Sequence, residues 1–220
     1  MMADAGSSGK YGVAAPTPLF PPGRIKIAEA LRSLLETKDF GSITTAEIAR
    51  TAGVTEALIY KYFKDKRDLL YEVLREYLEH YDARFEIDLK GIRGALNKLR
   101  KLIWSHINVY ATDRAFAKIL LIDVRSFSDY YTSRPYELVK KYSKIMLGVI
   151  EEGVAKGEIR EDISPRIIRQ AILGALENVC LTGVVFDREI SPEELTESLC
   201  DLLFSGIEKR ADAGMTGPHA

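Results

Sequence analysis

Apolar residues recur three and four positions apart along almost the whole of this 220-residue chain. This is the spacing of an amphipathic helix, and no run of strict apolar–polar alternation is long enough to predict a sheet. The fold class indicated is therefore all-α, with about nine helices. Because 46% of the residues are hydrophobic, the chain can bury a real core, which excludes disorder as its main state.

The ends of the chain depart from this pattern. Residues 1–22 are rich in Ala, Gly, Ser and Pro, and residues 211–220 are similar, so both are expected to be disordered tails. We expect a first domain over residues 23–70 and a second over 71–210. The spacing predicts helices at about residues 24–37, 44–53, 54–62, 65 to beyond 81, 91–111, 114–126, 133–156, 165–186 and 192–209.

Capping residues mark several of these helix starts. Thr44 and Asp65 each precede an acidic residue by three positions, which is the spacing of a capping box. Ser164–Pro165 and Ser191–Pro192 place a capping residue before a proline at the first helical position, where the missing N–H costs nothing.

The segment from Thr45 to Phe63 has the pattern of a helix-turn-helix. Two steeply crossing helices need a small residue at their closest approach, which Ala49 supplies, and Gly53 tolerates the positive φ of a tight turn. Apolar residues at 48, 52, 54 and 59 would lock the pair onto the first helix and leave one face of the second helix free. An ordinary helical hairpin with a solvated face is the alternative.

This free face and its surroundings carry hydrogen-bond donors and cations suited to phosphates and base edges. They are Thr44, Thr45, Thr55, Glu56, Tyr60, Lys61, Tyr62 and Lys66. The net charge of the whole chain is only −1, so any contact with DNA must be local. Cations slightly outnumber carboxylates between residues 24 and 70, and the remainder of the chain is net acidic.

Residues 24–74 resemble the TetR family of bacterial repressors. The motifs are Ile48-Ala49-x-x-Ala52-Gly53-Val54, Ile59-Tyr60-x-Tyr62-Phe63 and Lys66-x-x-Leu69-Leu70. The resemblance implies a homodimer whose two recognition helices enter successive major grooves of a pseudo-palindromic double-stranded DNA operator. It carries the phosphate-contacting positions to Thr44, Tyr60, Tyr62 and Lys66, and the base-reading positions to Thr55, Glu56, Ala57 and Lys61.

Two residues of this segment depart from the family pattern. Many members have Ser or Thr where this chain has Leu58, which could turn inward or touch a thymine methyl group. Glu56 would bring a carboxylate near the phosphates, and it could accept from a cytosine amino group. Both departures bear on the operator sequence rather than on DNA binding itself.

The second domain holds more aromatic residues, with polar groups between them, than a small helical core requires. Some are expected to line a pocket for a small hydrophobic effector, since pockets among helices are mostly apolar with a few polar groups. Plain core packing is the alternative for each of them. The candidate ligand-binding residues are Trp104, Tyr110, Phe116, Leu120, Arg125, Phe127, Tyr131 and Asn178.

Two of these candidates are polar and have a second interpretation. Arg125 could meet an anionic group of the ligand, or it could form an ion pair with Asp123 or Glu177. Asn178 lies in a strongly apolar stretch and could face either the pocket or a partner subunit.

The last two predicted helices are apolar over a broad arc and include the small residues Gly174, Ala175 and Gly183. In the TetR family the last two helices pair with their copies in an intermolecular four-helix bundle, which implies a homodimer formed here through the same helices. A buried core within one subunit is the alternative. The domain is also similar in length and aromatic content to TetR-family regulators of fatty-acid degradation, whose ligand is an acyl-CoA. An efflux-pump regulator that senses hydrophobic drugs would present nearly the same sequence.

Other functions find little support in the residues. No nucleophile–base pair, paired acid motif, phosphate loop or metal-ligand spacing indicates an enzyme or carrier, so we expect no catalytic residues, metal or cofactor. His80 and His106 stand apart from other metal ligands, and Cys180 and Cys200 are expected to be buried thiols.

The chain is expected to be cytoplasmic and not to associate with a membrane. No segment reads as the roughly 20 uncharged apolar residues of a membrane span, and no secretory signal precedes the first helix. The favoured hypothesis is a repressor released from its operator by a ligand. A helical enzyme or carrier, and a repressor without a sensor, are the alternatives.

Overall fold

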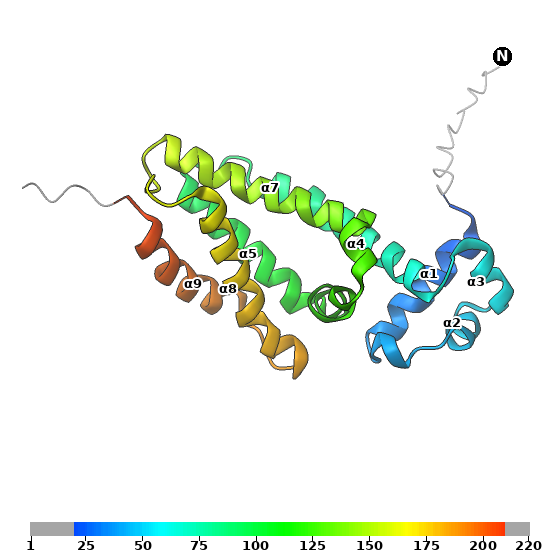
Figure 1. Ribbon diagram of the computed structural model, residues 1–220. Helices are drawn as coiled ribbons and strands as arrows, with labels where there is room; N and C mark the ends of the chain where they lie inside the picture. The colour runs from blue at the N-terminus through cyan, green and yellow to red at the C-terminus, as the bar shows by residue number, and fades with distance from the viewer. Residues whose placement is uncertain (1–19, 210–220) are drawn as a thin grey trace, which may run out of the picture.

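The computed structural model describes residues 20–209, and within that range it contains nine α-helices and no strand, which confirms the all-α prediction. The two predicted tails lie outside the described residues except at residues 20–22. Residues 20 and 21 lead into the first helix, and the tail prediction was wrong for Pro22, because this proline takes the first position of that helix. The helices are α1 (Pro22–Leu35), α2 (Thr45–Ala52), α3 (Glu56–Tyr62), α4 (Lys66–Asp88), α5 (Ala95–Thr112), α6 (Arg114–Lys118), α7 (Arg134–Ala155), α8 (Pro165–Val185) and α9 (Pro192–Ile207) (Figure 1).

Helices α1, α2 and α3 form a small three-helix unit at one end of the molecule (Figure 1). Gly53 ends α2 with φ of 65°, in the left-handed conformation that the predicted turn requires. Ala49 is buried where α2 meets its neighbours. Thr44 Oγ1 accepts from the backbone N–H of Glu47 at 3.2 Å, but the Glu47 carboxylate pairs with Lys38, so only half of the capping box forms.

The start of α3 differs from its prediction. The sequence places it at Val54, whereas the helix begins at Glu56 because Thr55 is extended, with φ of −86° and ψ of 152°. The two residues between Gly53 and Glu56 therefore belong to the turn.

Helix α4 leads from the three-helix unit into the larger bundle (Figure 1). Its first turns bury Leu69, Leu70, Val73 and Leu74 completely. Along this part it packs against α1, and farther along it packs against α7. One continuous helix thus joins the three-helix unit and the bundle, whose buried hydrophobic residues form one cluster.

The segment after α6 departs most from the sequence prediction of a single helix over residues 114–126. Helix α6 ends at Lys118 and is followed by a π-helical turn (Ile119–Asp123) and two 3₁₀ turns (Val124–Ser126 and Ser128–Thr132). Within these irregular turns, Arg125 Nε donates to the carbonyl oxygen of Leu120 at 3.1 Å. Turns of this kind inside helices often lie at functional sites.

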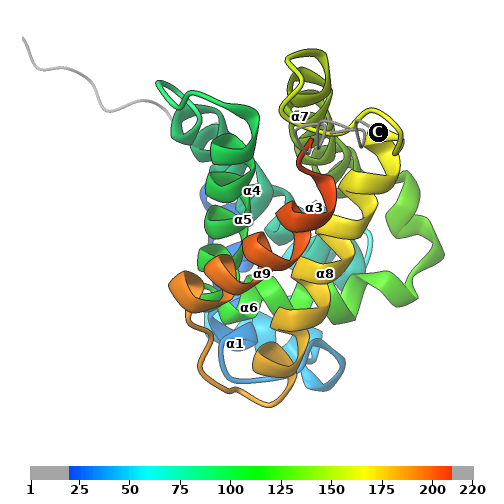
Figure 2. The ribbon, with the colours of Figure 1, turned by 90° about the vertical axis from the view of Figure 1, so that its left-hand side faces the viewer.

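Helices α5, α7, α8 and α9 complete the bundle, and α9 lies beside α8 and against α5 (Figure 2). By length and composition α8 is apolar enough to cross a membrane, with 33% of its most apolar stretch buried here. The expectation that no segment meets that test was therefore wrong for α8, because few charged residues interrupt it.

Candidate DNA-binding face and effector cavity

Six of the nine predicted DNA-contacting residues have exposed side chains around α3. They are Thr44, Thr55, Glu56, Ala57, Tyr60 and Lys61, while Thr45, Tyr62 and Lys66 are half-buried. The exposed face includes an aromatic ring, since Tyr60 is 57% exposed. The residues of α3 that pack inward, above all Ile59, hold this face outward.

The two unusual residues of α3 are both held in place by neighbours. Leu58 turns inward: its Cδ2 would lie 3.1 Å from a Cβ built on Gly23, at the start of α1. The Glu56 carboxylate accepts from Thr45 Oγ1 at 2.9 Å, which ties the start of α3 to the start of α2.

Lys66 differs from the other predicted phosphate contacts because its ammonium group already has protein partners. Its Nζ donates to the carbonyl oxygens of Phe40 at 2.8 Å and Ile43 at 2.6 Å, and it lies 4.3 Å from the centroid of the Phe40 ring. Partial burial lowers its pKa. Lys66 thus fixes the connection between α1 and α2, and one of its three N–H groups remains for another acceptor.

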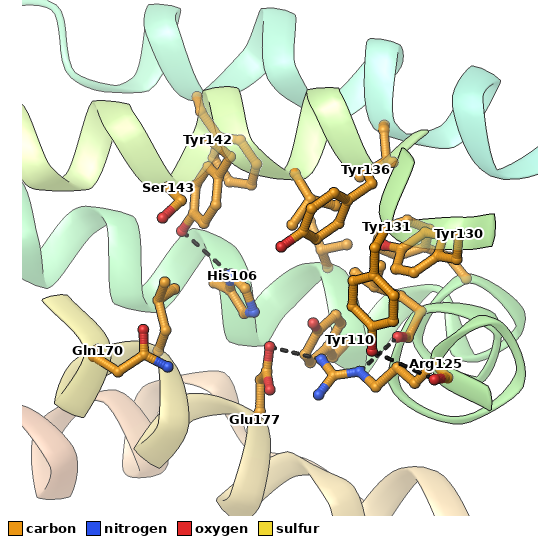
Figure 3. Close-up of a pocket in the computed structure, with 17 residues that line it drawn as sticks. His106, Tyr110, Arg125, Tyr130, Tyr131, Tyr136, Tyr142, Ser143, Gln170 and Glu177 are labelled. Atoms are coloured by element: carbon orange, nitrogen blue, oxygen red, sulfur yellow. Dashed lines mark hydrogen bonds and ion pairs between the residues drawn. The ribbon is translucent and has the colours of Figure 1, made fainter. Parts of the chain in front are cut away.

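A mostly apolar cavity of about 340 Å³ lies within the larger bundle (Figure 3). Five of the eight predicted ligand-binding residues line it, namely Tyr110, Phe116, Leu120, Arg125 and Tyr131. The sequence interpretation did not select Tyr136, Val139 and Ser143 of α7, or Gln170, Leu173 and Glu177 of α8. Within each set the residues are three and four positions apart, so each set lies on one face of its own helix. This spacing was the signal in the sequence that could have identified them as cavity residues.

Trp104, Phe127 and Asn178 lie outside this cavity, contrary to prediction. Residues two positions apart on a helix differ by about 200° in direction, so Trp104 faces away from the cavity-lining His106. Its Nε1 instead donates to Glu193 Oε1 at 3.1 Å. Asn178 is exposed on α8, one position beyond Glu177.

Phe127 lies between the two domains. Its ring packs edge-on against Phe40, with centroids 6.4 Å apart, and the Arg67 guanidinium lies 4.3 Å from its centroid. These contacts explain why an aromatic residue after a break in the helix does not reach the cavity.

An ion pair crosses one end of the cavity, where Arg125 Nη2 lies 2.8 Å from Glu177 Oε1 (Figure 3). Of the two acidic partners considered from the sequence, Glu177 is therefore the one used. Asp123 lies on the other side of the segment, and burial raises the pKa of its carboxyl to about 6.

His106 and Tyr110 provide further polar groups on α5. The Nδ1 atom of His106 lies 3.2 Å from the Tyr142 hydroxyl, and burial lowers the pKa of the imidazole to about 4, which keeps it neutral near pH 7. Within the described residues, no group of three His, Cys, Asp or Glu side chains could hold a metal ion. Cys180 and Cys200 are buried free thiols, as expected.

The segment over residues 119–132, which we call the coupling segment, touches both the cavity and the first domain. Leu120, Arg125 and Tyr131 line the cavity. On its other side, Asp129 Oδ1 accepts from Arg67 Nη1 at 3.1 Å and from the Tyr71 hydroxyl at 3.0 Å. The same carboxylate therefore joins the coupling segment to two residues of α4.

An exposed helix behind a tight turn, joined through α4 to a bundle with an apolar cavity, defines a ligand-responsive DNA-binding regulator. Comparison with known proteins agrees with this class. Residues 27–73 match the family described as "Bacterial regulatory proteins, tetR family", and residues 74–206 match "YsiA-like protein, C-terminal region". The chain therefore belongs to the TetR family of transcriptional regulators, which bind DNA operators as dimers and are not enzymes.

Relatives place it near regulators of fatty-acid metabolism. It is 30% identical over 189 residues to the "Fatty acid metabolism regulator protein" of Bacillus subtilis, covering 86% of this chain and 97% of the relative. The crystal structure of FadR from Bacillus subtilis in complex with stearoyl-CoA superimposes with a TM-score of 0.74 at 30% identity, covering 84% of this chain and 99% of that one. FadR from Bacillus halodurans has the same TM-score at 23% identity, covering 87% and 99%, which shows a shared fold.

Proposed function

We propose that this regulator is a homodimeric repressor that leaves its operator when an acyl-CoA binds in the cavity of the larger domain. The observation that carries the proposal is the position of the coupling segment, which lines the cavity on one side and contacts the first domain on the other. The complex of the Bacillus subtilis relative with stearoyl-CoA supports the choice of ligand class.

On the DNA side, we assign base reading to Thr55, Glu56, Ala57 and Lys61 and phosphate contacts to Thr44, Tyr60 and Tyr62. The exposure of most of these side chains around α3 supports the assignment. Thr45 borders this surface, but its hydroxyl donates to Glu56. Lys66 would serve the phosphates only with its remaining N–H, because two backbone carbonyls occupy the others.

The dimer would form through α8 and α9. On α8 one exposed stripe, with residues three and four positions apart, consists of Ile167, Ala171, Gly174 and Asn178. The side chain of Ile167 is 62% exposed. On α9, Leu202 is 71% exposed. A second copy of this face would cover both helices, which also accounts for the apolar character of α8 in a cytoplasmic protein. Small residues in the stripe would let two helices approach closely.

The effector would act by shifting a population. A ligand that fits the cavity only after the coupling segment moves would favour a conformation in which the Asp129 contacts with Arg67 and Tyr71 change. The first domain would then turn relative to the bundle, and the two recognition helices of the dimer would lose the spacing of successive major grooves.

The test is fluorescence anisotropy with a labelled duplex from upstream of the protein's own gene, at fixed salt, titrated first with protein and then with acyl-CoAs and with hydrophobic drugs. We expect selective binding that long acyl-CoAs release. Tyr60→Ala should weaken binding to all duplexes, whereas Lys61→Ala should change the preference among them. Selective binding that only drugs release would refute the acyl-CoA assignment.

A variant that fills the cavity tests whether effector binding can be lost without loss of DNA binding. Leu173 lines the cavity from α8, so Leu173→Trp should block release by acyl-CoA while leaving the affinity for DNA unchanged. Release that is unaffected by this substitution would place the effector elsewhere.

A further inference from the structure

We infer that the effector is an acyl thioester whose chain carries a neutral oxygen, a hydroxyl or a keto group, held by Tyr110 and His106. The inference rests on the proposed function, since it concerns the same cavity. It adds a specificity for an oxygenated chain over a plain hydrocarbon chain.

The basis is a pair of buried polar atoms that have no hydrogen-bond partner among the described residues, the hydroxyl of Tyr110 and Nε2 of His106. Both residues line the cavity, and Tyr110 is 1% exposed. They lie one helical turn apart on α5, with ring centroids 4.6 Å apart, and Figure 3 shows both facing the space beside Glu177. Buried polar groups are nearly always paired, so this pair of atoms calls for a partner.

The chemistry of the two groups selects the kind of partner. The Tyr110 hydroxyl can donate or accept, and a neutral imidazole carries one donor and one acceptor. Because Nδ1 of His106 lies against the Tyr142 hydroxyl, Nε2 is the nitrogen left for a ligand. A hydroxyl or keto oxygen can pair with these groups, whereas a methylene chain leaves both of them unpaired.

Neighbouring charge argues against an acidic group at this point. The carboxylate of Glu177 lies beside the same space, and its charge acts on both Tyr110 and His106. Arg125 already pairs with that carboxylate at 2.8 Å. A second carboxylate here would share a single cation, so the neutral oxygen fits the site better.

The test is a panel of acyl-CoAs of one chain length, saturated or bearing a hydroxyl or keto group at successive positions, each titrated against the protein–DNA complex. For at least one oxygenated member we expect release at a concentration roughly ten- to a hundredfold below that of the saturated chain, the range of a buried hydrogen bond gained. A saturated chain that is as effective as every oxygenated one overturns the inference but leaves the proposed function standing. Failure of every acyl-CoA to release DNA overturns both.

Variants locate the effect. Tyr110→Phe should reduce the preference for the oxygenated chain by roughly three- to tenfold, because it removes one of the two groups that hold the oxygen and leaves Nε2 of His106 in place. Tyr136→Phe makes the same change elsewhere on the cavity wall and should keep the preference. A preference of unchanged size after Tyr110→Phe overturns the assignment, and the panel on the unaltered protein decides the question even where that variant folds poorly.

Discussion

Lys66→Met removes an ammonium group that the structure places on two backbone carbonyls while keeping most of the apolar stem. The two bonds, at 2.8 and 2.6 Å, hold the connection between α1 and α2. A hydrogen bond to a charged group contributes about 1.5–3 kcal/mol. The site is half-buried and water can replace part of the loss, so we expect the free energy of unfolding to fall by about 2–3 kcal/mol. For a domain pair of this size that corresponds to roughly 4–12 °C in Tm.

Lys64→Met is the matched control, because Lys64 is exposed and its ammonium group makes no hydrogen bond or ion pair among the described residues. Thermal and urea unfolding at one protein concentration should show a change within about 0.5 kcal/mol for this variant. If Lys66 acted on phosphates alone, Lys66→Met would leave Tm unchanged and reduce the salt slope of DNA binding by about 0.9 per subunit. That pair of results would refute the structural role.

Three other substitutions test packing, assembly and electrostatics. Gly153→Ala should lower the free energy of unfolding in urea by about 1–3 kcal/mol, since the added Cβ would lie 2.6 Å from Cδ1 of Ile159. The control Gly148→Ala, on the same helix, adds a Cβ with no atom within 4 Å and should leave the free energy of unfolding unchanged or raise it. Ile167→Arg should give monomers in analytical sedimentation. The control Ile87→Arg, at a side chain on α4 that is 63% exposed, should stay dimeric. If both variants remain dimeric, α8 is not part of the interface. The raised pKa of Asp123, about 6, means that its carboxyl favours the fold only while protonated and loses that contribution as pH rises through 6. Asp123→Asn should therefore stabilise by about 2 kcal/mol at pH 8 and by almost nothing at pH 4, and an equal gain at both values would contradict this account.

The sequence predicted the parts that depend on local periodicity and backbone conformation. Ala49 and Gly53 suffice to predict the crossing and the turn of α2 and α3, because a small side chain and a positive φ are requirements that few residues meet. It did not predict that α6 would end at Lys118. The π-helical turn that follows depends on long-range packing and on Arg125 bonding to a carbonyl, neither of which has a periodic signature.

The cavity was predicted only in part for a related reason. An aromatic residue in a helical bundle is equally compatible with the cavity wall, the core or a contact between domains, and helix phase alone separates them. Trp104 and Tyr110 were both predicted to line the cavity, although six positions put them about 120° apart around a helix, so their angle was a signal against grouping them. Phe127 offered no such signal, because the helix is already broken where it lies. The ion pair of Arg125 was anticipated, but the choice of Glu177 over Asp123 required the position of α8.

The break after α6 gives the coupling segment a property that a regular helix would lack. In a continuous helix, Arg125 and Asp129 would be four residues apart and would share one face. In the irregular turns, Arg125 lines the cavity while Asp129 accepts hydrogen bonds from Arg67 and Tyr71 of α4. Under the proposed function, a ligand that displaces the cavity side of the segment would change the contacts of Asp129 with α4, whose first turns are buried against the DNA-binding unit. The loss of helical regularity is what lets the five residues from Arg125 to Asp129 connect the cavity to α4.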